Sequence, residues 1–365
     1  LALLLLASYL LKYHQGDVRK RSEIRVEKIS DIDQDDPYRH TRRIMKSYDR
    51  MFATAGGPVE LACRQVLFCI GLFDRPARMT LLNVLRSAEP IPGLTENLTD
   101  DNFRGALEEL RTLRLITADS EIAGECIDSH PLIREHFGHI FRDSFSEGWQ
   151  QAHRVIYDYL KSAATEYPST VSEIEPLLQA IAHGCEARQF QDVYHSVYRS
   201  RVMRGDQAFA ITKLGLVAPV ITCLSHFFEG GEWRRLRRAT QPSDLSESEE
   251  IELLLESGNF LTAVKGYAAS EVMQVYTTAA RLSSKPNRHQ ELITAVHGLW
   301  RHSLVCGDFH RTRDLAEQLH NLVATTDAPI GLMIDARVQC TTAYYMGSFH
   351  EALRRADEGI DRASK

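Results

Sequence analysis

The 365-residue sequence lacks a Cys-x-x-Cys pair, and its seven cysteines are scattered and odd in number. This spacing argues against a structural zinc site and against a framework of disulfides. Because disulfides persist mainly in oxidising compartments, cysteines of this kind favour a cytoplasmic location. The cysteines are Cys63, Cys69, Cys126, Cys185, Cys223, Cys306 and Cys340.

The common catalytic motifs are missing as well. No Lys follows Gly56-Gly57-Pro58 at P-loop spacing, and no metalloprotease, nucleophile-elbow or dinucleotide-binding motif occurs. None of the fifteen histidines forms an i, i+4 pair beside a carboxylate, so no metal site is predicted. His183 and Cys185 suggest a nucleophile pair, but neighbouring helical residues point about 100° apart, which favours a buried helical cysteine. We therefore expect this segment not to be an enzyme.

Neither sign of charge dominates, because 43 basic and 49 acidic residues leave a formal net charge of −6. That balance gives no reason to expect a nucleic-acid coat protein or a binder of anionic membranes. The opening apolar run, residues 1–11, is shorter than the roughly 20 residues that span a bilayer and has no signal-peptide flanks. We therefore predict that this run is a buried helix. Because the sequence has no initiator Met, we also expect it to be a fragment of a longer protein.

The residues that are present predict a helical, core-forming chain of two or three domains, with 44% hydrophobic and 25% charged residues. An amphipathic stretch at 44–52 precedes a compact unit that ends near residue 145. Three helices, a hairpin and a following helix in that unit are typical of a winged-helix domain. The helices are expected at 59–73, 80–88, from Thr99 or Asp100 as N-cap to 113, and 132–145, with hairpin strands at 115–117 and 126–127.

Residues 149–228 continue the helical pattern, with breaks expected near Pro168, Gly184, Gly205 and Pro219. We interpret the next stretch, 229–250, as an exposed connector that leads to a capped helix.

The connector contains Trp233 followed by the arginine-rich run 234–238. Basic and aromatic residues together suit single-stranded nucleic acid. An acidic stretch follows this run, however, and a solvated, neutralised connector is the favoured interpretation.

The last 115 residues repeat. Gly307-Asp308-Phe309-His310 and Gly347-Ser348-Phe349-His350 lie 40 residues apart, and Gly266-Tyr267 lies 41 residues before Gly307. Each is expected at the turn between two amphipathic helices, and helix pairs at this period predict an α-solenoid. No polar cap is evident at the last helix, so further repeats are expected to follow. Trp300, Tyr344 and Tyr345 are candidates for a partner-binding surface or for the core.

The third helix of the winged-helix unit is poorly suited to reading DNA. It contains Asp100, Asp101, Glu108 and Glu109 against three arginines. A helix with more acid than base meets phosphates unfavourably, so DNA binding through this unit is not expected.

Several stretches resemble signal-transduction ATPases of the STAND class (NACHT and NB-ARC), in particular bacterial members with tetratricopeptide-type repeats. The resemblance covers the winged helix and the repeats but no P-loop core. The stretches that resemble the family are Leu110-Arg111-Thr112-Leu113-Arg114-Leu115-Ile116, Ile127-Asp128-Ser129-His130-Pro131-Leu132-Ile133-Arg134-Glu135-His136-Phe137, residues 13–21, residues 182–185, residues 265–272 and Leu315-Ala316-Glu317-Gln318-Leu319.

The resemblance implies a molecular switch. In that family ADP holds the winged helix against the ATPase core, a trigger bound to the repeats frees it, ATP replaces ADP, and the protein self-oligomerises. ATP or ADP with Mg would then belong to the full-length protein, and the fragment itself would hold no cofactor.

His130 matches by position the His of the family's Met-His-Asp motif, which contacts the β-phosphate of ADP. Its neighbours here are Ser129 and Pro131 instead of Met and Asp. A phosphate contact and a simple helix cap at Pro131 both remain open for His130.

With the resemblance, the expected domains are the end of an ATPase-associated helical subdomain (1–55), the winged helix (56–146), a helical linker (147–245) and tetratricopeptide-like repeats (246–365). The favoured function is the regulatory and sensor portion of a STAND ATPase, whose repeats bind a protein or small-ligand trigger. The alternatives are an ATP-dependent transcriptional activator of the same architecture and a free-standing helical-repeat adaptor.

Overall fold

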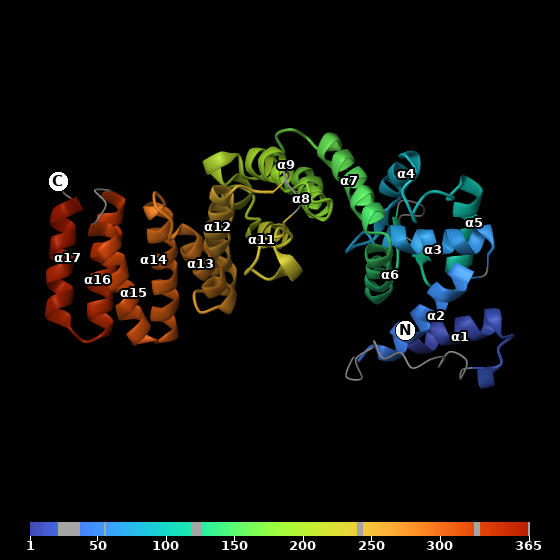
Figure 1. Ribbon diagram of the computed structural model, residues 1–365, viewed down its shortest axis with the longest axis horizontal. Helices are drawn as coiled ribbons and strands as arrows, with labels where there is room; N and C mark the ends of the chain where they lie inside the picture. The colour runs from blue at the N-terminus through green and yellow to red at the C-terminus, as the bar shows by residue number, and fades with distance from the viewer. Residues whose placement is uncertain (21–36, 55, 119–125, 239–243, 325–328, 364–365) are drawn as a thin grey trace. The chain divides into compact units, whose positions relative to one another are not determined.

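A computed structural model describes residues 1–20, 37–54, 56–118, 126–238, 244–324 and 329–363. The charged stretch at 21–36 and the turn of the predicted hairpin at 119–125 lie outside the described residues. The chain divides into two compact units, Leu1–Ser162 and Ala163–Lys365. It is mainly α-helical, and the predicted order of a winged helix, a helical linker and an α-solenoid is confirmed (Figure 1).

The first unit begins with α1, which is only partly buried. Leu5 and Leu10 are buried, whereas Leu3 is 82% and Leu11 is 72% exposed. The expectation of a buried helix is therefore wrong for one face of α1. The other face packs on α2, where the Tyr48 hydroxyl donates a hydrogen bond to the Leu5 carbonyl at 3.0 Å. The helices of this unit are α1 (Ala2–Tyr13), α2 (Arg39–Thr54), α3 (Pro58–Ile70), α4 (Met79–Ser87), α5 (Asp100–Thr112), α6 (Pro131–Ser144) and α7 (Ser146–Ala163).

Three short strands complete the winged helix: β1 (Ala77–Arg78), β2 (Thr117–Ala118) and β3 (Cys126–Asp128). They form one antiparallel sheet in the order β1-β3-β2, in which Ile127 of β3 lies opposite both Ala77 and Ala118. The helix–strand–helix–helix–hairpin–helix order matches the sequence prediction, apart from β1, which was not predicted. Thr99 is the N-cap of α5, as one of the two predicted candidates.

The second unit opens with α8 (Val171–Glu186), a short α9 (Phe190–Asp192) and η2 (Val193–Met203), a π-helix. The break predicted near Gly184 is present but displaced, because α8 continues to Glu186. The turn comes later, where Arg188 adopts a left-handed conformation with φ of 56°.

Two further short helices follow, α10 (Phe209–Thr212) and α11 (Val217–Ser225). In the part of the chain that is described, no single helix has the length and apolar composition needed to cross a membrane. The bent pair Gly205–Thr212 and Val217–Ser225 meets that criterion only when both halves are taken together.

The stretch after α11 differs from the exposed connector that the sequence suggested. Trp233 and Leu236 are buried, and Leu236 pairs with Phe228 in an isolated antiparallel bridge. Arg237 forms an ion pair with Glu186 at 2.7 Å. Because the Trp233 ring is buried and the Arg237 guanidinium is paired, neither group is available to a nucleic-acid strand. The alternative of single-stranded nucleic-acid binding therefore loses its structural basis.

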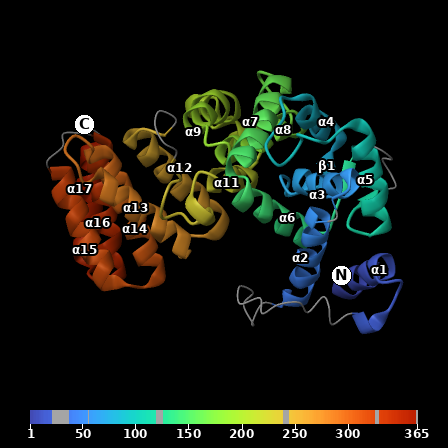
Figure 2. The same cartoon turned by 45° about the vertical axis from the view of Figure 1, so that its right-hand side comes forward.

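In the described residues the repeats comprise three helix pairs. These pairs stack side by side (Figures 1 and 2). The predicted turns are confirmed, since Gly266, Gly307 and Gly347 join the two helices of each pair with φ of 85°, 76° and 77°. The first helix begins with the predicted cap, a capping box formed by Ser246 and Glu249. The helices are α12 (Glu247–Lys265), α13 (Ser270–Ser283), α14 (His289–Cys306), α15 (Phe309–Ala324), α16 (Pro329–Tyr345) and α17 (Phe349–Ala363).

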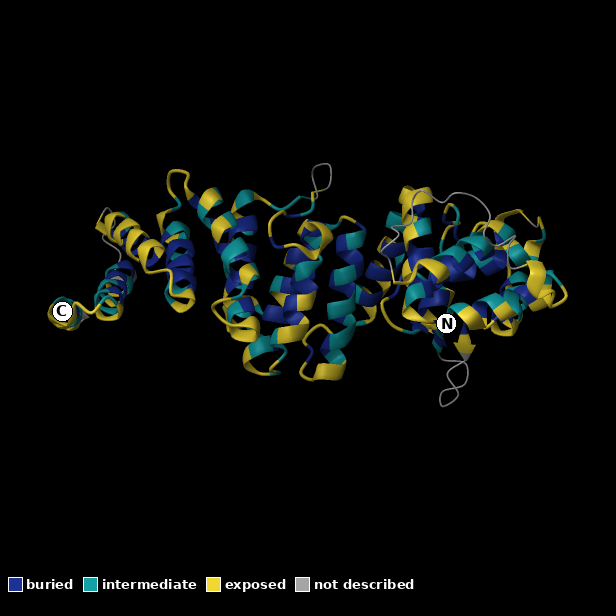
Figure 3. Ribbon diagram, turned by 90° about the horizontal axis from the view of Figure 1, so that it is seen from below, coloured by how far each residue is buried: buried dark blue, intermediate teal, exposed yellow. Residues whose placement is uncertain are grey.

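Buried residues of the repeats lie mainly on the helix faces that meet neighbouring helices (Figure 3). Each helix contacts the next one along the chain. The core is therefore built by stacking, as expected for a solenoid.

Candidate functional site

His130 stands exposed at the beginning of α6, directly after β3. Its Nδ1 accepts a hydrogen bond from the backbone N–H of Leu132 at 3.2 Å, so the ring caps the helix. In a neutral imidazole whose Nδ1 accepts, the proton is on Nε2, which is then a donor. Nδ1 of His130 therefore caps the helix, and Nε2 of this exposed residue remains as a donor.

The segment around His130 is held by hydrogen bonds within the winged helix. The Ser129 hydroxyl, which is buried, donates to the carbonyl of Leu115 at 2.8 Å. Asp128 accepts from the backbone N–H of Ser129 at 2.7 Å and forms an ion pair with Arg134. These contacts fix the backbone on both sides of His130, so that its ring has a defined position at the helix start.

Two turns further along α6, His136 occupies an unusual environment. It is 6% exposed, and its Nε2 makes no hydrogen bond. Burial, with the nearby charges of Arg42, Lys46 and His139, lowers the pKa of His136 to about 4. The ring is therefore neutral near pH 7. Sequence reasoning missed this residue, because a single His on an amphipathic helix gives no pattern to detect.

The third helix of the winged helix, α5, places its acidic first turn in solvent. The side chains of Asp100 and Asp101 are 88% and 89% exposed, and they pair with Arg86 and Arg104. Near the other end of the helix, Glu109 pairs with Lys12 of α1 at 2.9 Å. The expectation that DNA does not bind through α5 stays a prediction, with these exposed carboxylates in its favour.

His183 and Cys185, the one pair that suggested a nucleophile, both lie buried in α8. Burial raises the pKa of the Cys185 thiol well above its usual value. A thiol that resists ionisation is a poor nucleophile. Among the residues that the structure describes, no group of three or more His, Cys, Asp or Glu side chains is arranged to hold a metal ion.

The aromatic candidates of the repeats separate into core and surface. Trp300 is buried, and its indole N–H donates to the Thr342 hydroxyl at 2.9 Å, linking α14 to α16. Tyr344 and Tyr345 are 57% and 56% exposed. Their rings contact each other, and Tyr344 also contacts Phe349 of α17. Trp300 therefore belongs to the core, whereas the two tyrosines lie on a surface that a partner can reach.

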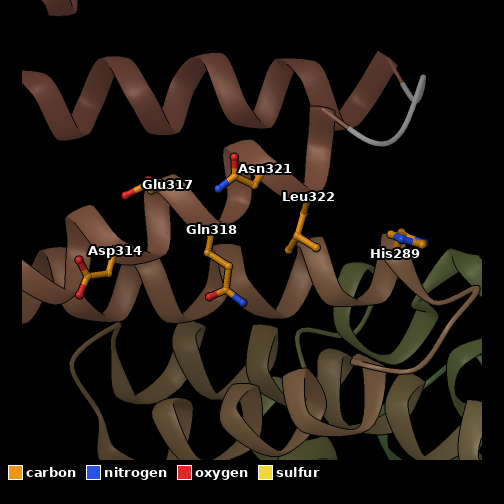
Figure 4. A pocket seen from close by; sticks show the side chains of 6 residues that line it. All are labelled: His289, Asp314, Glu317, Gln318, Asn321 and Leu322. Atoms are coloured by element: carbon orange, nitrogen blue, oxygen red, sulfur yellow. The ribbon is translucent and has the colours of Figure 1, made fainter.

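An open hollow of about 540 Å³ lies along α15. Figure 4 shows its side chains in a row that starts at Asp314 and ends at His289, the first residue of α14. The residues that line it are His289, Asp314, Glu317, Gln318, Asn321 and Leu322. The sequence offered no sign of this hollow, because it depends on how α14 and α15 are placed.

Comparison with known proteins gives little further information. No protein-family model matches the chain, and no curated protein matches it. A match among solved structures is a Signal Transduction ATPase with Numerous Domains (STAND) protein with a tetratricopeptide repeat sensor, from Pyrococcus horikoshii. The sequence identity is 12% and the TM-score is 0.34, over 88% of this chain. The chain spans 46% of the length of that protein.

Proposed function

We propose that this chain is the regulatory and sensor portion of a STAND-type signal-transduction ATPase of the NACHT and NB-ARC class. The observation that carries the proposal is the exposed His130 at the first turn of α6, whose cap uses Nδ1 and not Nε2, in a winged helix followed along the same chain by helical repeats. The proposal assigns no catalytic step to these residues. ATP hydrolysis with Mg²⁺ would belong to a P-loop core in the same protein.

His130 would act as a latch on bound ADP. Its Nε2–H would donate to a phosphate oxygen, a charge-assisted bond worth about 1.5–3 kcal/mol. The helix N-terminus beneath the ring adds a favourable field for an anion. Because the bond exists only while the winged helix is closed on the nucleotide, it stabilises the resting state relative to the open one.

The repeats would act as the sensor. Stacked helix pairs expose long surfaces from consecutive repeats, and such surfaces bind proteins or small ligands. A trigger that binds the open state more tightly than the closed one shifts the equilibrium by that difference in affinity. Release of the winged helix would then permit exchange of ADP for ATP and self-association.

The first test is the gene sequence upstream of the codon for Leu1. The proposal expects a P-loop and an acidic Mg²⁺-binding motif there. The protein that includes this region is then purified and denatured, and the released nucleotide is identified by chromatography. Co-purified ADP is the expected result.

Variants of His130 test the latch. His130→Ala removes both the cap and the donor, whereas His130→Asp keeps an N-cap acceptor and places a negative charge against the phosphate. Both should lose ADP, and His139→Ala, at an exposed position of the same helix, should retain it. An upstream region without a P-loop, together with a preparation free of nucleotide, would contradict the proposal and leave the helical-repeat adaptor. A helix-turn-helix encoded beyond Lys365 would instead favour the transcriptional activator.

A further inference from the structure

Among the residues that the structure describes, the polar side chains that line the hollow on α15 have no partners. Asp314, Glu317, Gln318 and Asn321 are all exposed, and none makes a side-chain hydrogen bond or an ion pair. Free side chains of this kind contribute little to the stability of the solenoid, so they are available to bind something else.

Most other carboxylates of the repeats are used internally. Glu247 binds Lys285 and Arg288, and Glu271 binds Lys265. Glu351 binds Arg354 and Arg355 of its own helix. Against this background, two unpaired carboxylates that share a hollow with two unpaired amides form a distinct surface.

We infer that the hollow on α15 binds a short, extended peptide segment that presents a cationic side chain to Asp314 and Glu317. This inference deepens the proposed sensor role and rests on it, because it names the chemistry of the protein trigger. The partner is a polypeptide, and the charge that it must supply is positive.

Charge complementarity determines one end of the site. Asp314 and Glu317 lie three residues apart, so they project from neighbouring positions on one face of α15. Two carboxylates with no internal cation match an arginine or lysine side chain, and a guanidinium accepts the geometry of carboxylate oxygens especially well. A cation bound at this position would pair with both carboxylates, which otherwise stand side by side with like charges.

The middle of the row suits a peptide backbone. Gln318 and Asn321 each offer an amide with both donors and acceptors, which match the N–H and C=O groups of an extended chain. From Asp314 to Leu322 the helix advances about 12 Å at 1.5 Å per residue. An extended peptide covers that distance with about four residues.

The far end of the row is less polar. Leu322 and the ring of His289 lie there, beyond Asn321 (Figure 4). Side chains four residues apart in an extended chain lie on the same face, about 13 Å from each other, so an apolar side chain four residues from the cation would contact them. The site therefore favours a segment with arginine or lysine, three spacer residues and an aliphatic residue.

The probes are two fluorescein-labelled peptides, in which arginine and leucine are separated by three alanines and appear in either order between glycine flanks. Citrulline replaces arginine in the control peptides, since it keeps the shape and removes the charge. Binding to the purified protein is followed by fluorescence polarisation up to about 1 mM protein, and hydrogen exchange locates the contact. The expected result is saturable binding of one arginine peptide, with protection along residues 314–322.

The double variant Asp314→Asn, Glu317→Gln should weaken that binding by about tenfold, because it removes both charges and keeps the shapes of the side chains. Asp357→Asn, at an exposed and unpaired acid on α17, is the matched control and should bind as the parent does. Thermal melts by circular dichroism check that both variants fold. Equal binding to the double variant, equal binding of the citrulline peptide, or no saturable binding would overturn the inference.

The two proposals fail separately. If the peptides do not bind but ADP retention still depends on His130, the surface on α15 is refuted and the sensor role stands. If an arginine peptide binds as described but the protein contains no P-loop and no nucleotide, the STAND proposal is refuted and the chain is a peptide-binding adaptor.

Discussion

The ring of Tyr276 in α13 lies directly against Gly298 in α14. A Cβ added at Gly298 would stand 2.6 Å from ring carbons of Tyr276, closer than real side chains approach. The same ring also meets Gly258 of α12, again at 2.6 Å from an added Cβ. The Tyr276 hydroxyl donates to Asn259 at 2.9 Å. One buried tyrosine thus holds three consecutive helices of the solenoid together.

Replacing Gly298 by Ala should destabilise the repeats by about 1–3 kcal/mol, because the new methyl group forces the ring of Tyr276 out of its slot. Gly105→Ala in α5 is the control, since an added Cβ there makes only an ordinary contact with Val59 at 3.4 Å. At such a helical position Ala is favoured over Gly by up to about 1 kcal/mol. Urea unfolding of both variants measures the difference. A Gly298→Ala protein as stable as the parent would show that the helices accept the methyl group beside the ring of Tyr276 without strain.

The repeat architecture was predictable because its turns have a local cause. Gly266, Gly307 and Gly347 each need a positive φ, and their regular spacing appears directly in the sequence. The contact between Tyr276 and Gly298 was not predictable. It joins residues on different helices, and neither residue type alone indicates a partner.

The failures of sequence analysis have a similar explanation. Trp233 lies in an arginine-rich run that resembles a solvated connector. Its burial depends on how this stretch folds back on itself, which places the ring of Phe228 4.8 Å from that of Trp233. Strand β1, Ala77–Arg78, is too short to give an alternating pattern. The π-helical form of η2 also has no distinct apolar period that separates it from an α-helix.

The candidate site was only partly visible in the sequence. His130 could be singled out because the stretch 127–137 resembles a known family, although the neighbours of His130 differ from the family's motif. Its cap on α6 was one of two open interpretations. The hollow on α15 could not be found, since unpaired side chains are defined by what surrounds them in space. Asp314 and Glu317 look in the sequence like any solvated helix face.

The contact between η2 and α12 gives a second prediction. The Tyr198 hydroxyl donates to Glu256 at 2.7 Å, and Arg199 also pairs with this carboxylate at 3.7 Å. Tyr198→Phe removes a hydrogen bond to a mostly buried charged group and should cost about 1.5–3 kcal/mol. Tyr159→Phe is the control, because Tyr159 is 36% exposed and its hydroxyl has no partner among the described residues. Equal loss of stability in both variants, measured by urea unfolding, would refute a specific role for the bond to Glu256.

The third prediction concerns acid and His136. Its pKa lies near 4 in the folded protein against 6.5 for an unperturbed His, so the unfolded chain binds a proton more readily. The contribution of this group to stability is therefore complete above pH 6.5 and is lost as the pH falls from 6.5 towards 4. The loss amounts to at most about 3 kcal/mol, from a pKa difference of this size.

His136→Leu removes this titration and keeps an apolar side chain in the buried space. The fall in unfolding free energy between about pH 7 and pH 4.5 should then be smaller by about 2 kcal/mol than in the parent. His139→Gln, at an exposed position one turn away, should leave most of the fall in place. If His136→Leu lost as much stability in acid as the parent, the buried ring would already be protonated or solvated in the folded state. The interpretation of His136 as a neutral core residue whose Nε2 makes no hydrogen bond would then be wrong.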